Sequence, residues 1–162
     1  MQDQGAKNSM EMGYFDSGAK TFRLWTTAKQ WLGTPWAANS ASRGPRGGVS
    51  CHNLPRAILI EVGHLRADFP EVTGDPNATR HSTDSVIVPF LDSRKEFFRV
   101  PLGEKMRAGD LLGIRIYKTV DHLGLYVGSQ TFVHVLMHQK TTTDSVVDPT
   151  WGERVQAIWR PV

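Results

Sequence analysis

The spacing of apolar residues changes once along this 162-residue chain, and that change constrains the fold more than any other feature. Between residues 19 and 62, apolar side chains recur at three- and four-residue intervals, which is the spacing of amphipathic helices. From residue 108 onward, short apolar runs alternate with turn residues and predict β-strands. Helices followed by an antiparallel sheet make an α+β plan, and the length suits one domain.

Two helices are expected in the first part. Residues 1–17 are polar and predict a loosely ordered lead-in, with Ser17 as a helix cap. A first helix is expected over residues 19–32, ended by the glycine and proline that follow it. A second begins within Gly47–Gly63, where apolar residues again have helical spacing. The domain itself is expected to span residues 18–162, with the first helix packed on the second.

The one cysteine of the chain, Cys51, falls where this second helix begins. A thiol there meets the positive end of the helix dipole and unpaired backbone N–H groups, and both favour the nucleophilic thiolate. A single cysteine cannot form an intramolecular disulfide. The alternative is an inert, buried cysteine, because free cysteine is among the most buried residue types. The stretch alone leaves both interpretations open.

Three strands are predicted clearly, over residues 111–117, 122–127 and 131–137. Residues 146–147 and 155–159 can supply one or two more. The apolar runs 86–91 and 97–100 are compatible with either strand or helix.

A cysteine nucleophile needs a base, and the predicted hairpin offers His122 and His134. A three-residue loop over residues 128–130 pairs positions of equal parity, so both histidines are expected on one face, opposite a continuous apolar face. A two-residue loop would put them on opposite faces. His138 is the alternative third residue. His52 neighbours the cysteine on the helix and is expected to point away from the thiol.

Other classes of function lack support in the sequence. Without Cys51, His122 and His134 would be interpreted as two half-buried histidines of a sheet with no catalytic role. A zinc site would need a third ligand, and the His and Cys spacings typical of such sites are missing, so no metal or cofactor is expected. The basic residues that give the net charge of +3 are scattered along the chain and do not form a nucleic-acid-binding motif. No run is long enough to span a membrane, and the first twenty residues lack a signal-peptide core, although a removed signal would leave the same chain.

The ordered landmarks resemble those of the NlpC-type cell-wall peptidases, which are papain-like cysteine hydrolases. The resemblance runs from about Phe22 to the C-terminus, and the two histidines lie twelve residues apart. The matching segments are Gly33-Thr34-Pro35-Trp36, Ser50-Cys51, Ala108-Gly109-Asp110-Leu111-Leu112, His122-Leu123-Gly124-Leu125-Tyr126-Val127-Gly128 and His134.

This resemblance implies a papain-like fold, with the cysteine helix packed on an antiparallel sheet or partial barrel. It implies cleavage of amide bonds in peptidoglycan stem peptides, with Cys51 as nucleophile, His122 as base and His134 as the residue that orients it. Trp36, Ser50 and His52 would contact the substrate. We expect a monomer without nucleic-acid partners, secreted, periplasmic or attached to the wall of a bacterium, or associated with a phage.

The chain also departs from the family pattern. The family commonly has Asp before the cysteine and Ser-Gly after it, where this chain has Ser50 and His52-Asn53. Since the position after the cysteine often contacts the substrate's amine, the family's substrate preference is not carried over. The long stretch before Gly109 predicts an insertion that shapes the cleft. The alternatives are an amidase at the sugar–peptide junction, an acyltransferase and a non-catalytic binding module. Permuted lipid-acting relatives place the histidine before the cysteine, whereas here Cys51 precedes His122, which argues against them.

Overall fold

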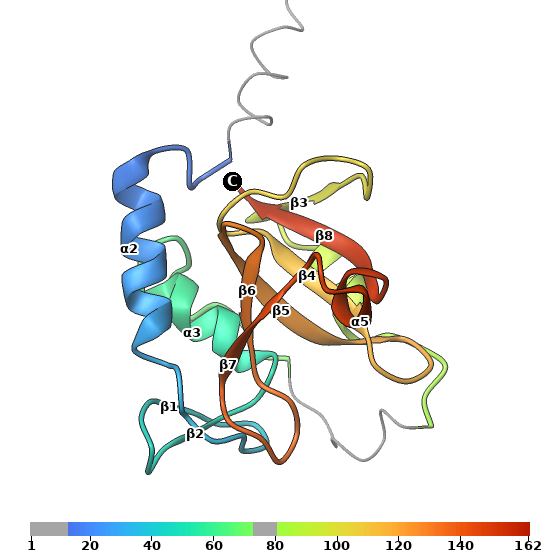
Figure 1. Cartoon of the computed structure of the whole chain (residues 1–162), viewed down its shortest axis with the longest axis horizontal. Coiled ribbons are helices and arrows are strands. Elements are labelled where there is room, and N and C mark those ends of the chain that lie inside the picture. The colour runs from blue at the N-terminus through green and yellow to red at the C-terminus, as the bar shows by residue number, and fades with distance from the viewer. Residues whose placement is uncertain (1–12, 73–80) are drawn as a thin grey trace, which may run out of the picture.

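A six-stranded antiparallel sheet, in the order β3-β8-β4-β5-β6-β7, forms the centre of the molecule in the computed structural model, which describes residues 13–72 and 81–162 (Figure 1). Within these residues the α+β prediction is confirmed. The helices are α2 (Gly18–Lys29), α3 (Asn53–Glu61), α4 (Ile87–Asp92) and α5 (Pro149–Gly152). The strands are β1 (Ala41–Ser42), β2 (Gly48–Val49), β3 (Phe97–Val100), β4 (Leu111–Arg115), β5 (Val120–Gly128), β6 (Thr131–His134), β7 (Thr142–Ser145) and β8 (Val155–Pro161).

The two predicted helices, α2 and α3, pack on each other and on β5 (Figure 1). Ser17 caps α2 as expected, since its side chain accepts the N–H of Lys20 at 3.2 Å. Leu24 and Ala28 are fully buried, whereas Phe22 is 70% exposed. The buried stripe of α2 is therefore narrower than the run of apolar residues suggests.

The sheet buries apolar side chains on both of its faces, because β-strand residues alternate between the two. One face of β5 carries Leu123 and Leu125 and packs in the same core cluster as helices α2 and α3. The other face carries Tyr126 and forms a second cluster with Phe132 and side chains near α5. The histidines of the predicted hairpin belong to this second face, as the register shows.

The turn between β5 and β6 differs from the expected three-residue loop, yet the histidines still share a face. Gly128 pairs with Thr131, so only two residues, both with positive φ, form the loop. The register shifts by one residue between Tyr126 and Gly128. This bulge restores the equal parity that a two-residue loop would otherwise remove.

The two apolar runs that are compatible with either strand or helix adopt different structures. Residues 86–91 contribute helix α4, and residues 97–100 form edge strand β3. Beyond β6, the added strand is Thr142–Ser145, not residues 146–147. Of the predicted lead-in, residues 1–12 lie outside the described part of the chain. Tyr14 and Phe15 follow them and contact the core, Phe15 being buried.

The Gly109-Asp110 landmark ties the sheet to the C-terminal strand. Gly109 has φ of +95°, and a Cβ there would lie 2.2 Å from the ring of Phe15. The buried Asp110 carboxylate accepts two hydrogen bonds from the Arg160 guanidinium, both at 2.8 Å, and one from the N–H of Arg107. Burial raises the pKa of Asp110 although Arg160 opposes this effect.

We expect Arg160→Met to lower the free energy of unfolding by about 3–5 kcal/mol, because it leaves a buried carboxylate without its partner. Chemical denaturation at pH 7 measures this loss. Arg66→Met is the matched control, since the Arg66–Asp68 pair is exposed and should contribute less than about 1 kcal/mol. Equal losses in the two variants would contradict the structural role given to the Asp110–Arg160 pair.

Candidate active site

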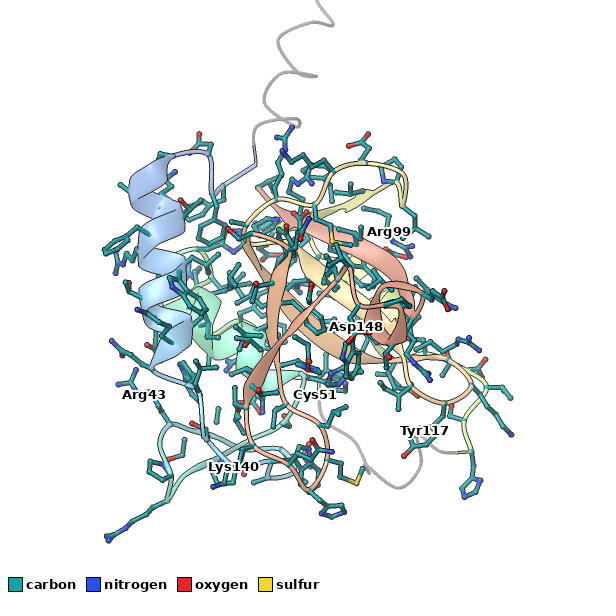
Figure 2. All side chains as sticks on the ribbon, in the orientation of Figure 1. Arg43, Cys51, Arg99, Tyr117, Lys140 and Asp148 are labelled. Carbon is teal, nitrogen blue, oxygen red and sulfur yellow. The ribbon has the colours of Figure 1, made fainter. Side chains whose placement is uncertain are left out.

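Cys51 lies at the start of α3, two residues before the first helical residue, as the sequence predicts. The Ser50 side chain accepts the N–H of Asn53 at 3.3 Å and so helps to cap this helix. Cys51 is labelled in Figure 2. Its thiol reaches the beginning of strand β5, where Sγ is 3.8 Å from the carbonyl oxygen of Asp121. The next residue along β5 is His122, whose imidazole interacts with the thiol and lowers its pKa.

A hydrogen-bonded chain runs from His122 into the interior. Nε2 of His122 is 2.7 Å from Nδ1 of His134, and Nε2 of His134 is 2.7 Å from a carboxylate oxygen of Asp144. Phe132 and Trp151 pack against the His134 ring, with centroids at 4.6 and 4.7 Å. The expected pairing of His122 and His134 is present, and Asp144 extends it by one group.

Electrostatics keep the middle member of this chain uncharged. Burial and the positive charge of His122 lower the pKa of His134 to about 4, against the opposing effect of Asp144. Neutral His134 therefore donates its Nε2–H to Asp144 and accepts the Nε2–H of His122 at its Nδ1. The tautomer of His122 is fixed in this way, which leaves its Nδ1 for the thiol.

His52 differs from its prediction. Instead of pointing away from the thiol, its ring interacts with the charge of Cys51, and its Nε2–H donates to the carbonyl oxygen of Asp121 at 2.8 Å. Burial opposes a charge on this ring. The negative charge of Cys51 and the hydrogen bonding of the ring nevertheless raise the pKa of His52 to about 9. The contact with Asp121 of strand β5 sets the direction of this ring, which precedes the first helical residue of α3.

The Cys51 thiol is surrounded by groups that favour its ionised form. Burial raises its pKa, but the charges and hydrogen bonds of His52 and His122 together hold it well below its usual value. These interactions favour the reactive interpretation of Cys51 over the inert one.

A cavity of about 470 Å³ opens above the thiol. Its lining includes Cys51 and His122 together with the three residues expected to contact substrate, Trp36, Ser50 and His52. His134 is fully buried behind His122. Segments between the cysteine helix and β3 also contribute to the lining, through Val72, Ser82, Asp84, Val86 and Ile87.

The remaining histidines lie elsewhere. His138, the alternative third residue, is exposed, with its ring centroid 5.3 Å from that of Trp36. His81 is exposed and His64 packs against Tyr14. Asp144 is not predicted from the sequence, because it lies on strand β7, which the sequence pattern does not indicate. Its even residue number, like those of the two histidines, is the one signal for a shared face.

The residues matched by the NlpC/P60 family model, 43–160, cover most of the chain, and the protein belongs to this family of papain-like cysteine peptidases that act on bacterial peptidoglycan. Over 64 residues it is 31% identical to the peptidoglycan DL-endopeptidase CwlO of Bacillus licheniformis; this match covers 40% of the chain and 14% of that protein.

Two solved structures share the fold. An NLP/P60-family protein of Staphylococcus aureus, described as similar to lipoprotein, aligns with a TM-score of 0.59 at 14% identity, covering 90% of this chain and 42% of that one. The NlpC/p60 domain of the peptidoglycan hydrolase SagA aligns with a TM-score of 0.53 at 17% identity, covering 85% and 96%. These likenesses support the papain-like fold.

Two further observations concern residues 13–72 and 81–162. No group of three His, Cys, Asp or Glu side chains there could hold a metal ion. Among the same residues, no helix is long and apolar enough to cross a membrane.

The lowered pKa of His134 predicts acid sensitivity. Unfolded histidine titrates near 6.5, so between pH 6.5 and about 4 the unfolded state binds the extra proton and the folded state loses about 3 kcal/mol. We expect His134→Gln to lose less stability than the wild type when the pH falls from 7 to 4.5, as measured by urea unfolding. Equal losses would show that His134 is not held neutral.

Proposed function

We propose that this chain is a cysteine hydrolase that cleaves an amide bond in peptidoglycan stem peptides through an acyl-enzyme. The observation that carries the proposal is the series Cys51–His122–His134–Asp144, in which the buried histidines are joined at 2.7 Å and His134 is joined to Asp144 at 2.7 Å. This is the arrangement of nucleophile, base and orienting residue that covalent acyl transfer requires.

In the proposed first step, the Cys51 thiolate attacks the carbonyl carbon of the scissile amide. Backbone N–H at Cys51, at the start of α3, helps to hold the oxyanion. The carbon–nitrogen bond then breaks, and the departing amine takes a proton from Nδ1 of His122. The product is a thioester on Cys51, and the amine fragment leaves the cavity.

In the second step, neutral His122 accepts a proton from water, and the resulting hydroxide attacks the thioester carbon. The carbon–sulfur bond breaks, the acid fragment leaves and the thiolate forms again. His134 keeps Nε2 of His122 protonated in both steps, because Asp144 holds the other N–H of His134. Asp144 is thus a positioning residue for the base.

Family membership supports peptidoglycan as the substrate, and CwlO is named for a DL-endopeptidase activity. The cavity, at about 470 Å³, has the volume of a ligand-binding pocket, and Trp36 offers it an aromatic wall. Trp36, Ser50 and His52 are the proposed substrate contacts. Family members act on the cell wall, so we place the protein outside the cytoplasmic membrane or at the wall.

We expect Cys51→Ala to abolish the release of fragments from purified peptidoglycan, because no other thiol is present in the chain. Mass spectrometry of the muropeptides detects the fragments and identifies the scissile bond. Thermal unfolding verifies that the variant is folded. Unchanged turnover in the folded variant would overturn the thiol mechanism.

The role of Asp144 predicts a graded series. Asp144→Ala should lower kcat roughly 10-fold or more with little change in KM, because His122 loses its fixed tautomer, and Asp144→Asn should recover part of this loss by keeping an acceptor. His134→Ala should leave only weak activity. Asp68→Ala, at an exposed aspartate, is the control. A change in KM alone for Asp144→Ala would argue against positioning of the base.

A further inference from the structure

We propose that His52 is a second imidazole partner of the Cys51 sulfur, which keeps the thiolate ionised while His122 transfers protons. The proposal deepens the proposed function and rests on it only for the use of the thiolate in hydrolysis. Neither the family pattern at this position, which is serine, nor the catalytic triad includes such a group.

The His52 ring and the Cys51 sulfur both contact the carbonyl oxygen of Asp121. The carbonyl oxygen of Asp121 is 2.8 Å from Nε2 of His52 and 3.8 Å from Sγ of Cys51. This carbonyl belongs to the first residues of β5, so the sheet fixes the position of the His52 ring beside the sulfur. The negative charge of Cys51 in turn favours the protonated His52 ring, so the two side chains interact directly.

The hydrogen bonds of His52 suit a cation that stays protonated. A carbonyl oxygen accepts but cannot donate, so the His52 nitrogen that faces Asp121 must carry a hydrogen. The backbone of Val72 also favours the protonated ring, as does the Asp121 carbonyl. Held in this way, the imidazolium stabilises negative charge on sulfur without giving up its proton.

The charges around His52 agree with this assignment. Cys51 faces it from the start of α3, and the Asp121 carboxylate interacts with it from β5. Asp84, Tyr117 and His122 line the same cavity. A cation at His52 therefore has the thiolate and an acidic side chain as partners, which lowers the cost of its burial.

Division of labour between two imidazoles has a chemical consequence. In a simple Cys–His pair, deprotonation of the histidine removes the counter-charge that keeps the thiol ionised. With His52 in place, the thiolate persists when His122 is neutral. The sulfur that leaves the thioester in the second step is therefore stabilised as a thiolate by His52, whatever proton His122 carries.

The experiment that tests this inference is the pH dependence of iodoacetamide alkylation, which reports Cys51 alone because the chain has one cysteine. Four proteins are compared: the wild type, His52→Gln, His122→Asn and the double variant. Glutamine keeps a donor for the Asp121 carbonyl but carries no charge. His81→Gln, at an exposed histidine, is the matched control and should titrate like the wild type.

We expect His52→Gln to raise the alkylation midpoint by one pH unit or more, which slows the reaction about tenfold at a pH below both midpoints. His122→Asn should keep a midpoint well below 8.5, and the double variant should approach that ordinary value. A His52→Gln midpoint equal to that of the wild type would overturn the inference while leaving the Cys51–His122 mechanism intact. An ordinary midpoint in the wild type would overturn both.

A second measurement needs no substitution. The imidazole NMR signal of His52 in the wild-type protein should report a protonated ring at pH 7.5, and alkylation of Cys51 should remove the thiolate that favours this charge, so that the pH at which the ring titrates falls. A His52 ring that is neutral before alkylation would contradict the inference. Loss of peptidoglycan cleavage in Cys51→Ala tests the hydrolase function separately.

Discussion

The pairing of β5 with β6 is the constraint on which the candidate active site depends. Side chains alternate between the faces of a strand, so a hairpin brings two histidines together only if its register gives them the same parity. The two-residue loop of this hairpin has the wrong count, and the bulge between Tyr126 and Gly128 corrects it. The contact of 2.7 Å between His122 and His134 is a direct result of that correction.

The packing around the hairpin protects this contact. Gly124 of β5 leaves room for a ring of β6, because a Cβ at this position would lie 2.7 Å from the ring of Phe132. Phe132 in turn packs against His134, together with Trp151 of α5. Apolar surroundings of this kind disfavour a positive charge on His134 and strengthen its hydrogen bonds to His122 and Asp144. The neutral state of His134 thus follows from ordinary core packing.

Periodicity and spacing were sufficient to predict the α+β class, both main helices and the helix-start position of Cys51, because these depend on local patterns. The shared face of His122 and His134 was also predicted, although from a loop of the wrong length. Asp144 and the orientation of His52 depend on tertiary contacts. The former needs the pairing of β7 with β6, and the latter needs the Asp121 carbonyl, sixty-nine residues away in the sequence.

Enclosure of the thiol links the cavity to its electrostatics. Segments from the Trp36 loop, the start of α3, residues 82–87 and the start of β5 meet around Cys51 and exclude part of the solvent. Burial alone would keep the thiol protonated, and the same low-dielectric surroundings strengthen its interactions with the two imidazoles. A single imidazole would have to overcome the desolvation of the sulfur while also exchanging its own proton. In the arrangement that we propose, a second imidazole at position 52 shares these two tasks with His122.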